Sequence, residues 1–275
     1  MIKEPIMSAL KHEKATLSWT LNTAMVLYVA FAVPGICRAE LALNGAVEYL
    51  SWKEATTPQV KETGPLLTLG ISYIENRESG ALFAYRGKLW GGTVEYDGST
   101  LFGNTPTSGR TTYAGLDNEL QARWRRSHAP DAKVDIILGA GVDAWRRSLS
   151  AEQKEDFAIG YLRLGVESST DDSKRWSVSM GLKYPVWTYA DAHLDDVGFD
   201  SNPTLRPGRE ISPFGSLGYR LAHNLRLIGY YDGFHFSRSA PVQTNEVAMG
   251  VGPVALVQPA TTMSVFGLKL EYRLR

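Results

Sequence analysis

An acidic side chain and an imidazole stand two residues apart at Asp191 and His193, and chemistry should be sought there first. Carboxylates and imidazoles can accept and return a proton. The pair ends residues 175–193, where apolar residues alternate with small or polar ones. A period of two describes a β-strand, and it places residues two apart on one face. Counting along the polar face predicts that both side chains point inward at the far end of this strand.

The strand that must position this pair is long and has two different faces. Its apolar face carries Trp176, Val178, Met180, Leu182, Tyr184 and Val186. Aromatic residues lie near both ends of that face. A transmembrane barrel needs strands of this kind, because it meets lipid on the outside and encloses a polar lumen.

The whole chain after its first forty residues divides into similar segments. The ten alternating segments are residues 41–52, 66–75, 82–96, 111–126, 133–146, 157–167, 175–193, 211–221, 225–236 and 263–274. Short turns rich in Asn, Asp, Ser and Pro alternate with longer polar loops, as in outer-membrane proteins. The pattern predicts an all-β fold, a ten-stranded antiparallel up-and-down transmembrane β-barrel.

A soluble calyx would show the same period with its apolar face inside. The polar faces of the segments carry many charges of both signs, among them Arg163, Lys183 and Arg226. In a small transmembrane barrel these charges become an internal network. The aromatic strand ends and a secretory signal favour the membrane. A narrow barrel filled with bulky charged residues also disfavours a general porin.

The N-terminus has the three parts of a secretory signal. Lysines precede an apolar run, residues 24–33, and Cys37 and Ala39 supply the small residues that a signal peptidase requires. The run is too short for a membrane-spanning helix. We expect a cleaved signal peptide, residues 1–39, and an outer-membrane barrel domain, residues 40–275. The predicted location is the bacterial outer membrane.

Composition limits the partners and cofactors. The chain has 275 residues with 29 basic and 29 acidic side chains, and its single cysteine lies in the predicted signal. Disulfides are therefore excluded from the mature chain, and near-neutrality argues against nucleic-acid binding. The sequence indicates no cofactor and no metal site. An extracellular ligand or peptide is not identified by any motif.

The C-terminal strand carries a candidate assembly signal. A glycine at Gly267 is followed by alternating hydrophobic residues up to Tyr272, which resembles the signal that outer-membrane proteins present to the barrel assembly machinery. The chain departs from that pattern by ending in Leu274 and Arg275 instead of an aromatic residue.

Ten strands with this order of loops resemble the omptins, the ten-stranded outer-membrane endopeptidases. Omptins carry Asp-x-His where strand seven enters its loop and Asp-x-Asp where strand three enters its own. Asp191 and His193 match the first motif, and Glu95 and Asp97 match the second with one Glu for Asp. The resemblance implies that His193 is a general base oriented by Asp191, and that Glu95 and Asp97 polarise the attacking water. It also implies lipopolysaccharide as a lipid partner.

The acid pair meets the lumen only if strand three changes phase. Counted from Phe83 and Leu89, Glu95 and Asp97 point outward. A β-bulge at the glycine pair, residues 91–92, would insert one residue and turn both acids inward. We therefore expect a bulge there if the pair is catalytic.

Three functions remain open at this stage. The first is a non-catalytic surface, structural or receptor barrel that acts through its loops. The second is an omptin-like endopeptidase, and the third is a narrow channel. The loop of residues 237–262 is unusual because residues 247–257 are apolar. We expect a strand extension or a self-packed lid there, or an exposed contact surface for a partner or lipid.

Overall fold

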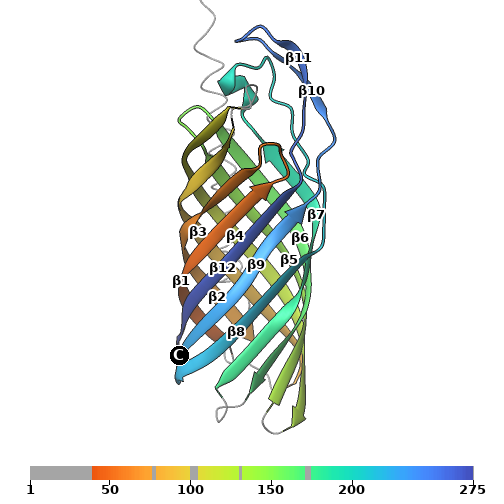
Figure 1. The fold of residues 1–275 in the computed structure, drawn as a ribbon. Coiled ribbons are helices and arrows are strands. Elements are labelled where there is room, and N and C mark those ends of the chain that lie inside the picture. Colours follow the sequence, from red (N-terminus) through yellow and green to blue (C-terminus); the bar gives the residue numbers. More distant parts are fainter. Residues whose placement is uncertain (1–38, 76–78, 100–104, 130–131, 171–174, 275) are drawn as a thin grey trace, which may run out of the picture. The chain divides into compact units, whose positions relative to one another are not determined.

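The computed structural model describes residues 39–75, 79–99, 105–129, 132–170 and 175–274. Ten strands form a closed barrel (Figure 1). They are β1 (Ala39–Glu54), β2 (Val60–Glu75), β3 (Gly80–Ser99), β4 (Pro106–Ala129), β5 (Ala132–Ser148), β6 (Lys154–Thr170), β7 (Trp176–Asp191), β8 (Ser212–Ala222), β9 (Leu225–Phe236) and β12 (Thr261–Leu274). The predicted signal peptide, apart from Ala39, lies outside the described residues and stays a prediction.

The strand order confirms the predicted fold class. Each strand neighbours the next along the chain, β12 follows β9, and β12 closes the barrel by antiparallel pairing with β1. Each of the ten predicted segments falls on one of these strands, and several strands extend further than predicted. Within the described ranges, no helix is long and apolar enough to span a bilayer.

The outer wall of the barrel is apolar. Large aliphatic side chains are exposed on it at Leu43, Val47, Leu67, Leu69, Leu89, Leu120, Ile136, Leu138, Val142, Leu162, Leu164, Val166, Met180, Leu182, Leu217, Leu268 and Leu270. Aromatic pairs flank this belt, with Trp176 against Tyr219 near the short turns and Tyr231 against Phe266 toward the loops. A wall of this kind is suited to lipid, with its aromatic rings at the interfaces.

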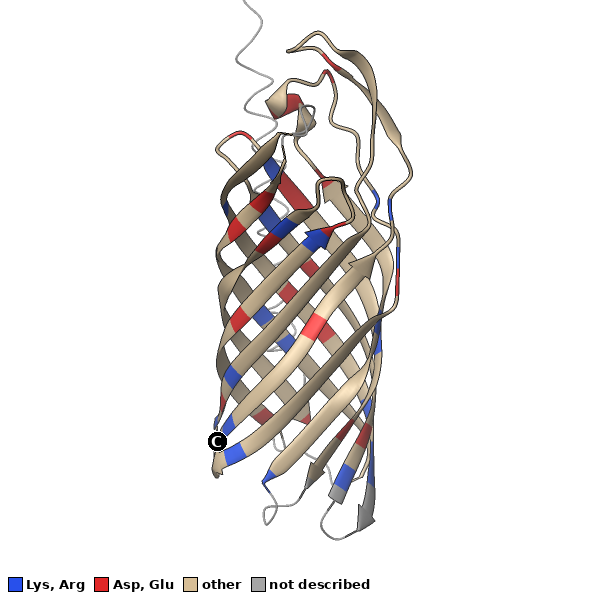
Figure 2. Cartoon of the chain, in the orientation of Figure 1, with Lys and Arg blue, Asp and Glu red and all other residues tan. Residues whose placement is uncertain are grey.

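Charged side chains lie inside the barrel. The side chains of Arg163, Lys183 and Arg226 are 11%, 4% and 16% exposed, although Arg163 and Lys183 lie in the middle of their strands. Figure 2 shows acidic and basic residues along the whole height of the strands. This arrangement excludes the soluble calyx, because a calyx keeps its charges on the outside.

The long loops lie at one end of the barrel and carry structure of their own. A short 3-10 helix, η2 (Leu194–Val197), begins the β7–β8 connection. Strands β10 (Val242–Glu246) and β11 (Gly252–Leu256) form a separate two-stranded hairpin above the barrel (Figure 1). The apolar residues 247–257 therefore do not extend a barrel strand, which excludes that one of the three alternatives.

Candidate functional site

Strand β3 has no bulge at its glycine pair. It pairs with β4 in one continuous register, in which Gly91 faces Ala114 and Gly92 faces Tyr113. A Cβ atom on Gly91 would lie 2.8 Å from the carbonyl oxygen of Tyr113, and one on Gly92 would lie 2.7 Å from that of Pro65. The glycines thus serve close approach of neighbouring strands instead of an inserted residue. The bulge expected for a catalytic acid pair is therefore absent from this part of β3.

Continuous alternation leaves the two predicted acids on the outer wall. Glu95 and Asp97 are exposed, whereas Val94, on the inner face of the same strand, is buried. In the cross-strand register Glu95 faces Arg110, and Asp97 faces Lys61. These four residues line a depression on the outside of β2, β3 and β4. The acid pair therefore does not face the lumen.

Strand β7 contains the bulge that strand β3 lacks. Tyr161 of β6 faces Pro185, and Gly160 faces Trp187, so Val186 has no residue opposite it. Proline has no amide hydrogen and cannot continue a ladder of hydrogen bonds at its own position. One extra residue turns every later side chain to the other face of the sheet.

The bulge reverses the predicted orientation of the dyad. Beyond it, Thr188 and Ala190 are buried inside the barrel, and Trp187 is 49% exposed on the outside. Asp191 follows Trp187 on the outer face, next to Asp156 of β6 in the cross-strand register. The expectation that Asp191 and His193 point into the lumen was wrong, because the inward phase ends at Pro185.

His193 pairs with an acid that the sequence pattern did not indicate. Its Nε2 atom lies 2.9 Å from Oδ2 of Asp156. The same carboxylate accepts two hydrogen bonds from Arg146, of 2.7 and 2.6 Å. Arg146 lies on β5, directly opposite Asp156 of β6 in the cross-strand register. The result is an outer-rim cluster of Arg146, Asp156, Asp191 and His193, in which the imidazole faces a carboxylate already occupied by a guanidinium.

Asp191 holds the backbone after β7 and not the imidazole ring. Its Oδ1 atom accepts the backbone N–H of His193 at 3.0 Å and the side-chain amide of Asn202 at 2.6 Å. Its other oxygen accepts the hydroxyl of Tyr189 at 3.1 Å. His193 adopts a left-handed backbone conformation with φ of 47°. Asp191 thereby fixes the course of the loop that leaves β7.

A second acid, Asp200, attaches the β10–β11 hairpin to this loop. Its carboxylate accepts the backbone N–H and the side-chain amide of Asn245, at 3.0 and 2.6 Å. The hydroxyls of Ser201 and Thr244 also donate to it. The hydrogen bonds from Asn245 lower the pKa of Asp200 to about 2. The carboxylate form is therefore the one that holds the hairpin.

This anchor predicts a pH dependence for the hairpin. A depressed pKa means that the attachment is complete above the ordinary Asp pKa of about 4 and is lost as the pH falls toward 2. Amide exchange of residues 242–256, corrected for intrinsic rates, should stay slow from pH 7 to 4 and quicken below. The variant Asp200→Asn should exchange faster at neutral pH and show a flatter profile. Equal exchange in both proteins would contradict the anchor.

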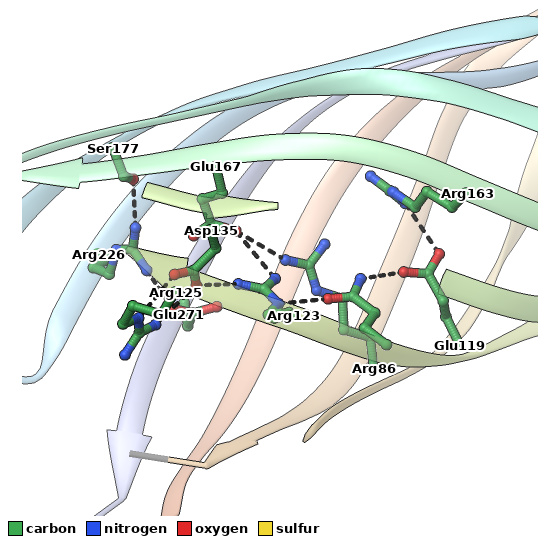
Figure 3. A network of polar contacts seen from close by, with 11 residues as sticks. Arg86, Glu119, Arg123, Arg125, Asp135, Arg163, Glu167, Ser177, Arg226 and Glu271 are labelled. Carbon is green, nitrogen blue, oxygen red and sulfur yellow. Dashed lines mark hydrogen bonds and ion pairs between the residues drawn. The ribbon is translucent and has the colours of Figure 1, made fainter. Parts of the chain in front are cut away.

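The half of the lumen near the short turns is filled by an arginine–carboxylate network (Figure 3). Arg123 lies 3.3 Å from Asp135 and 3.1 Å from Glu167, and its Nε atom donates to Gln121 at 2.8 Å. Arg86 also reaches Glu167, and Arg163 reaches Glu119. The partners come from four consecutive strands, β3 to β6, so the network ties neighbouring strands of this part of the wall together.

At mid-height the lumen holds lysines between carboxylates. Lys183 lies 2.5 Å from Asp232, and Lys88 lies 3.5 Å from Glu48. Tyr230 also donates to Glu48. The space left between these side chains is a cavity of about 20 Å³. That volume holds on the order of one water molecule.

The half of the lumen near the loops is closed by aromatic rings and one caged arginine. Trp52, Trp145 and Phe157 are buried and pack against each other. Arg147 is 3% exposed, and its guanidinium lies over the ring of Trp52. Three glutamates surround that guanidinium. They are Glu54 at 3.1 Å, Glu155 at 2.8 Å and Glu62 at 2.5 Å.

Sequence reasoning assigned these four cage residues to loops. The alternation of inward and outward positions along the strands would have identified them as lumen residues. Inward positions on β1 continue from Leu50 through Trp52 to Glu54, and those on β5 continue from Asp143 to Arg147. β1 and β5 continue past the predicted segments, residues 41–52 and 133–146, because charged side chains occupy further inward positions of the same strands. No pattern in the sequence indicated Asp156 as the partner of His193.

The closed barrel, the apolar wall and the charge-filled lumen together define a transmembrane β-barrel of the bacterial outer-membrane type. No protein-family model matches the sequence, and no curated protein matches it.

Several solved outer-membrane barrels are similar in structure. The chain is similar to the outer membrane protease OmpT from Escherichia coli, at 12% identity and a TM-score of 0.49, covering 86% of this chain and 96% of that one. It is also similar to the transport unit of the autotransporter AIDA-I from Escherichia coli, at 9% identity and a TM-score of 0.40, over 91% and 96%. An outer membrane channel from Pseudomonas putida F1 matches at 10% identity and a TM-score of 0.39, over 88% and 100%.

Proposed function

We propose that this protein is a non-catalytic barrel of the outer membrane that acts at the cell surface through its loops. The observation that carries the proposal is the filled lumen. Side chains occupy it in three layers: the arginine–carboxylate network, the lysine layer and the aromatic layer with its caged arginine. A pore needs a continuous water path, and a cavity of about 20 Å³ does not supply one.

The loop end carries the features expected of a surface-acting barrel. The carboxylates of Asp191 and Asp200 each accept a hydrogen bond from a backbone N–H group of the loops and so fix the loop backbone. Such contacts preorganise a loop and lower the entropy that a partner must overcome on binding. Ordered loops on a rigid scaffold are the usual place for recognition.

Planar-bilayer recordings test the closed lumen. We expect the refolded protein to give no single-channel conductance over the usual voltage range, because three layers of side chains must move before ions pass. The variant Trp52→Ala serves as a comparison, since it removes one ring of the aromatic layer and keeps Arg147 with its three glutamates. Regular open-channel steps from the unaltered protein would overturn the proposal in favour of a narrow channel.

Omptin-like endopeptidase activity is the alternative function, and one observation favours it. His193 lies within hydrogen-bond distance of Asp156 at the exposed rim, so an oriented imidazole is present to take a proton from water. The geometry of the acids disfavours it. Glu95 is on the outer face of β3, and β3 and β7 are four strands apart around the wall. Glu95 and Asp97 would have to reach His193 past the barrel rim to polarise the same water.

Cleavage of basic peptides by the purified protein, with and without lipopolysaccharide, decides between the two functions. We expect no cleavage above the uncatalysed rate. Activity that falls at least about a hundredfold in His193→Ala would establish the alternative, since a general base contributes about that much or more. Variants Glu95→Gln and Asp97→Asn would then show whether the outer-wall acids take part.

We also propose that the protein reaches the outer membrane by cleavage of its signal peptide and insertion by the barrel assembly machinery. Cleavage after Ala39 would leave a mature chain that begins at the edge of β1. The strand that carries the candidate assembly signal, Gly267 to Tyr272, pairs with β1 and closes the barrel. This position suits a segment recognised by the barrel assembly machinery. The mass of the protein extracted from outer membranes checks the cleavage site.

A further inference from the structure

The β10–β11 hairpin ends in an apolar tip, formed by residues 247–251. Val247, Met249 and Val251 are 58%, 65% and 53% exposed. The sequence has no charged residue from position 247 to 257. Gly250 and Gly252 adopt positive φ angles of 72° and 81°, which let the chain turn sharply here. Three large aliphatic side chains are thus presented together on a tight turn.

Four backbone N–H groups of the tip are paired from within the protein. The buried carboxylate of Glu246 accepts the N–H groups of Met249 and Val251, at 2.7 and 3.1 Å. The carbonyl oxygen of Gly198 accepts those of Val247 and Ala248, at 2.9 and 3.2 Å. A turn in water can leave such donors to solvent, but donors that enter hydrocarbon must be paired.

The tip is also held on a fixed base. The Asp200–Asn245 hydrogen bonds and the backbone bridge between Phe199 and Glu246 join the hairpin to the β7–β8 loop. Figure 1 shows the hairpin beyond the barrel rim, at the end opposite the C-terminus. The apolar wall that contacts the protein's own bilayer lies on the barrel strands below. The tip therefore points away from that bilayer.

We propose that this tip inserts into the lipid of a second, facing membrane. The inference rests on the proposed function, action through the loops, and names the partner of one loop. The absence of charge on the tip indicates which kind of partner it binds. The tip offers no charge to a charged partner and none of the Trp, Tyr or Arg side chains that usually anchor a protein interface. Its uncharged side chains and paired donors match the acyl layer of a bilayer. Glu246 beneath the turn limits insertion to the side chains at the tip.

The test uses the full mature protein in lipid nanodiscs, floated with phosphatidylcholine vesicles at 0.1 and 0.5 M salt. We expect the nanodiscs to float with the vesicles equally at both salt concentrations. The triple variant Val247→Ser/Met249→Ser/Val251→Ser should lower the vesicle partition coefficient at least about tenfold, because several buried methylene groups are lost. The variant Gln243→Ser, at an exposed position on β10 outside the tip, is the matched control and should not change it.

Four results would overturn the proposal. The first is no flotation of the unaltered protein, and the second is equal flotation of the triple variant with amide exchange showing an intact hairpin. The third is binding that needs anionic lipid and disappears with salt, which would assign recognition to charged headgroups. The fourth is pairing of nanodiscs without vesicles, which would make a second copy of the chain the occupant. The proposed function is tested by conductance and cleavage, so its failure is separate from each of these.

Discussion

Replacing Arg123 by alanine should destabilise the folded barrel by about 3–5 kcal/mol, the usual cost of removing one partner from a buried ion pair. Arg123 is 3% exposed and lies between Asp135 and Glu167. Its loss removes the cation that the two carboxylates share in the lower lumen, and leaves Asp135 with Arg125 and Glu167 with Arg86. Denaturant unfolding of the refolded protein in lipid vesicles measures the change.

The control for this prediction lies three residues along the same strand. Arg126 is exposed on β4, so Arg126→Ala should change the free energy of unfolding by less than about 1 kcal/mol. The variant Arg123→Met keeps much of the side-chain volume and separates loss of charge from loss of packing. If Arg123→Ala and Arg126→Ala cost the same, the lower network does not stabilise the barrel.

The second large effect is expected at the caged arginine. Arg147→Ala leaves Glu54, Glu62 and Glu155 facing one another inside the barrel, with their cation removed. A loss of about 3–5 kcal/mol, or failure to refold, follows from the uncompensated charge. The same unfolding assay measures it.

A second substitution shows whether charge is the cause. Glu62 is fully buried and also accepts a hydrogen bond from Tyr113. In the Arg147→Ala background, Glu62→Gln removes one of the three negative charges at nearly constant size. It should recover part of the lost stability, although Glu62→Gln alone should be destabilising. Additive losses in the double variant would contradict the electrostatic cage, because coupled residues depart from additivity.

The class of fold was accessible from the sequence because its signal is local. A period of two sets the face of every residue relative to its neighbours, so ten alternating segments predict ten strands. Charges at Arg163, Lys183 and Arg226 identified the polar face, and the structure places them inside. Residues a few positions apart therefore identified the polar face, and the structure settled the choice between membrane barrel and calyx by placing that face inside.

The predicted orientations of the candidate site residues differ from the structure at positions where the alternation of period two breaks, or continues where a break was expected. Pro185 was read as one more inward position of β7, although the bulge that follows it turns Asp191 outward. A bulge at the glycine pair of β3 would have turned Glu95 and Asp97 inward, but there the glycines allow neighbouring backbones to approach. Glycine and proline each fit both interpretations, and the neighbouring strand decides between them.

The sequence by itself determined that the chain forms strands with one apolar and one charged face, since alternation needs only adjacent residues, whereas the structure decided that the charged face lines the inside. Tertiary structure alone decided which charges meet. His193 lies against Asp156, 37 positions earlier, because the β6–β7 register brings Asp156 beside Asp191. Arg147 meets Glu54 and Glu62 across the lumen, 93 and 85 positions away. Contacts of that kind depend on closure of the sheet, which brings together side chains that no local pattern relates.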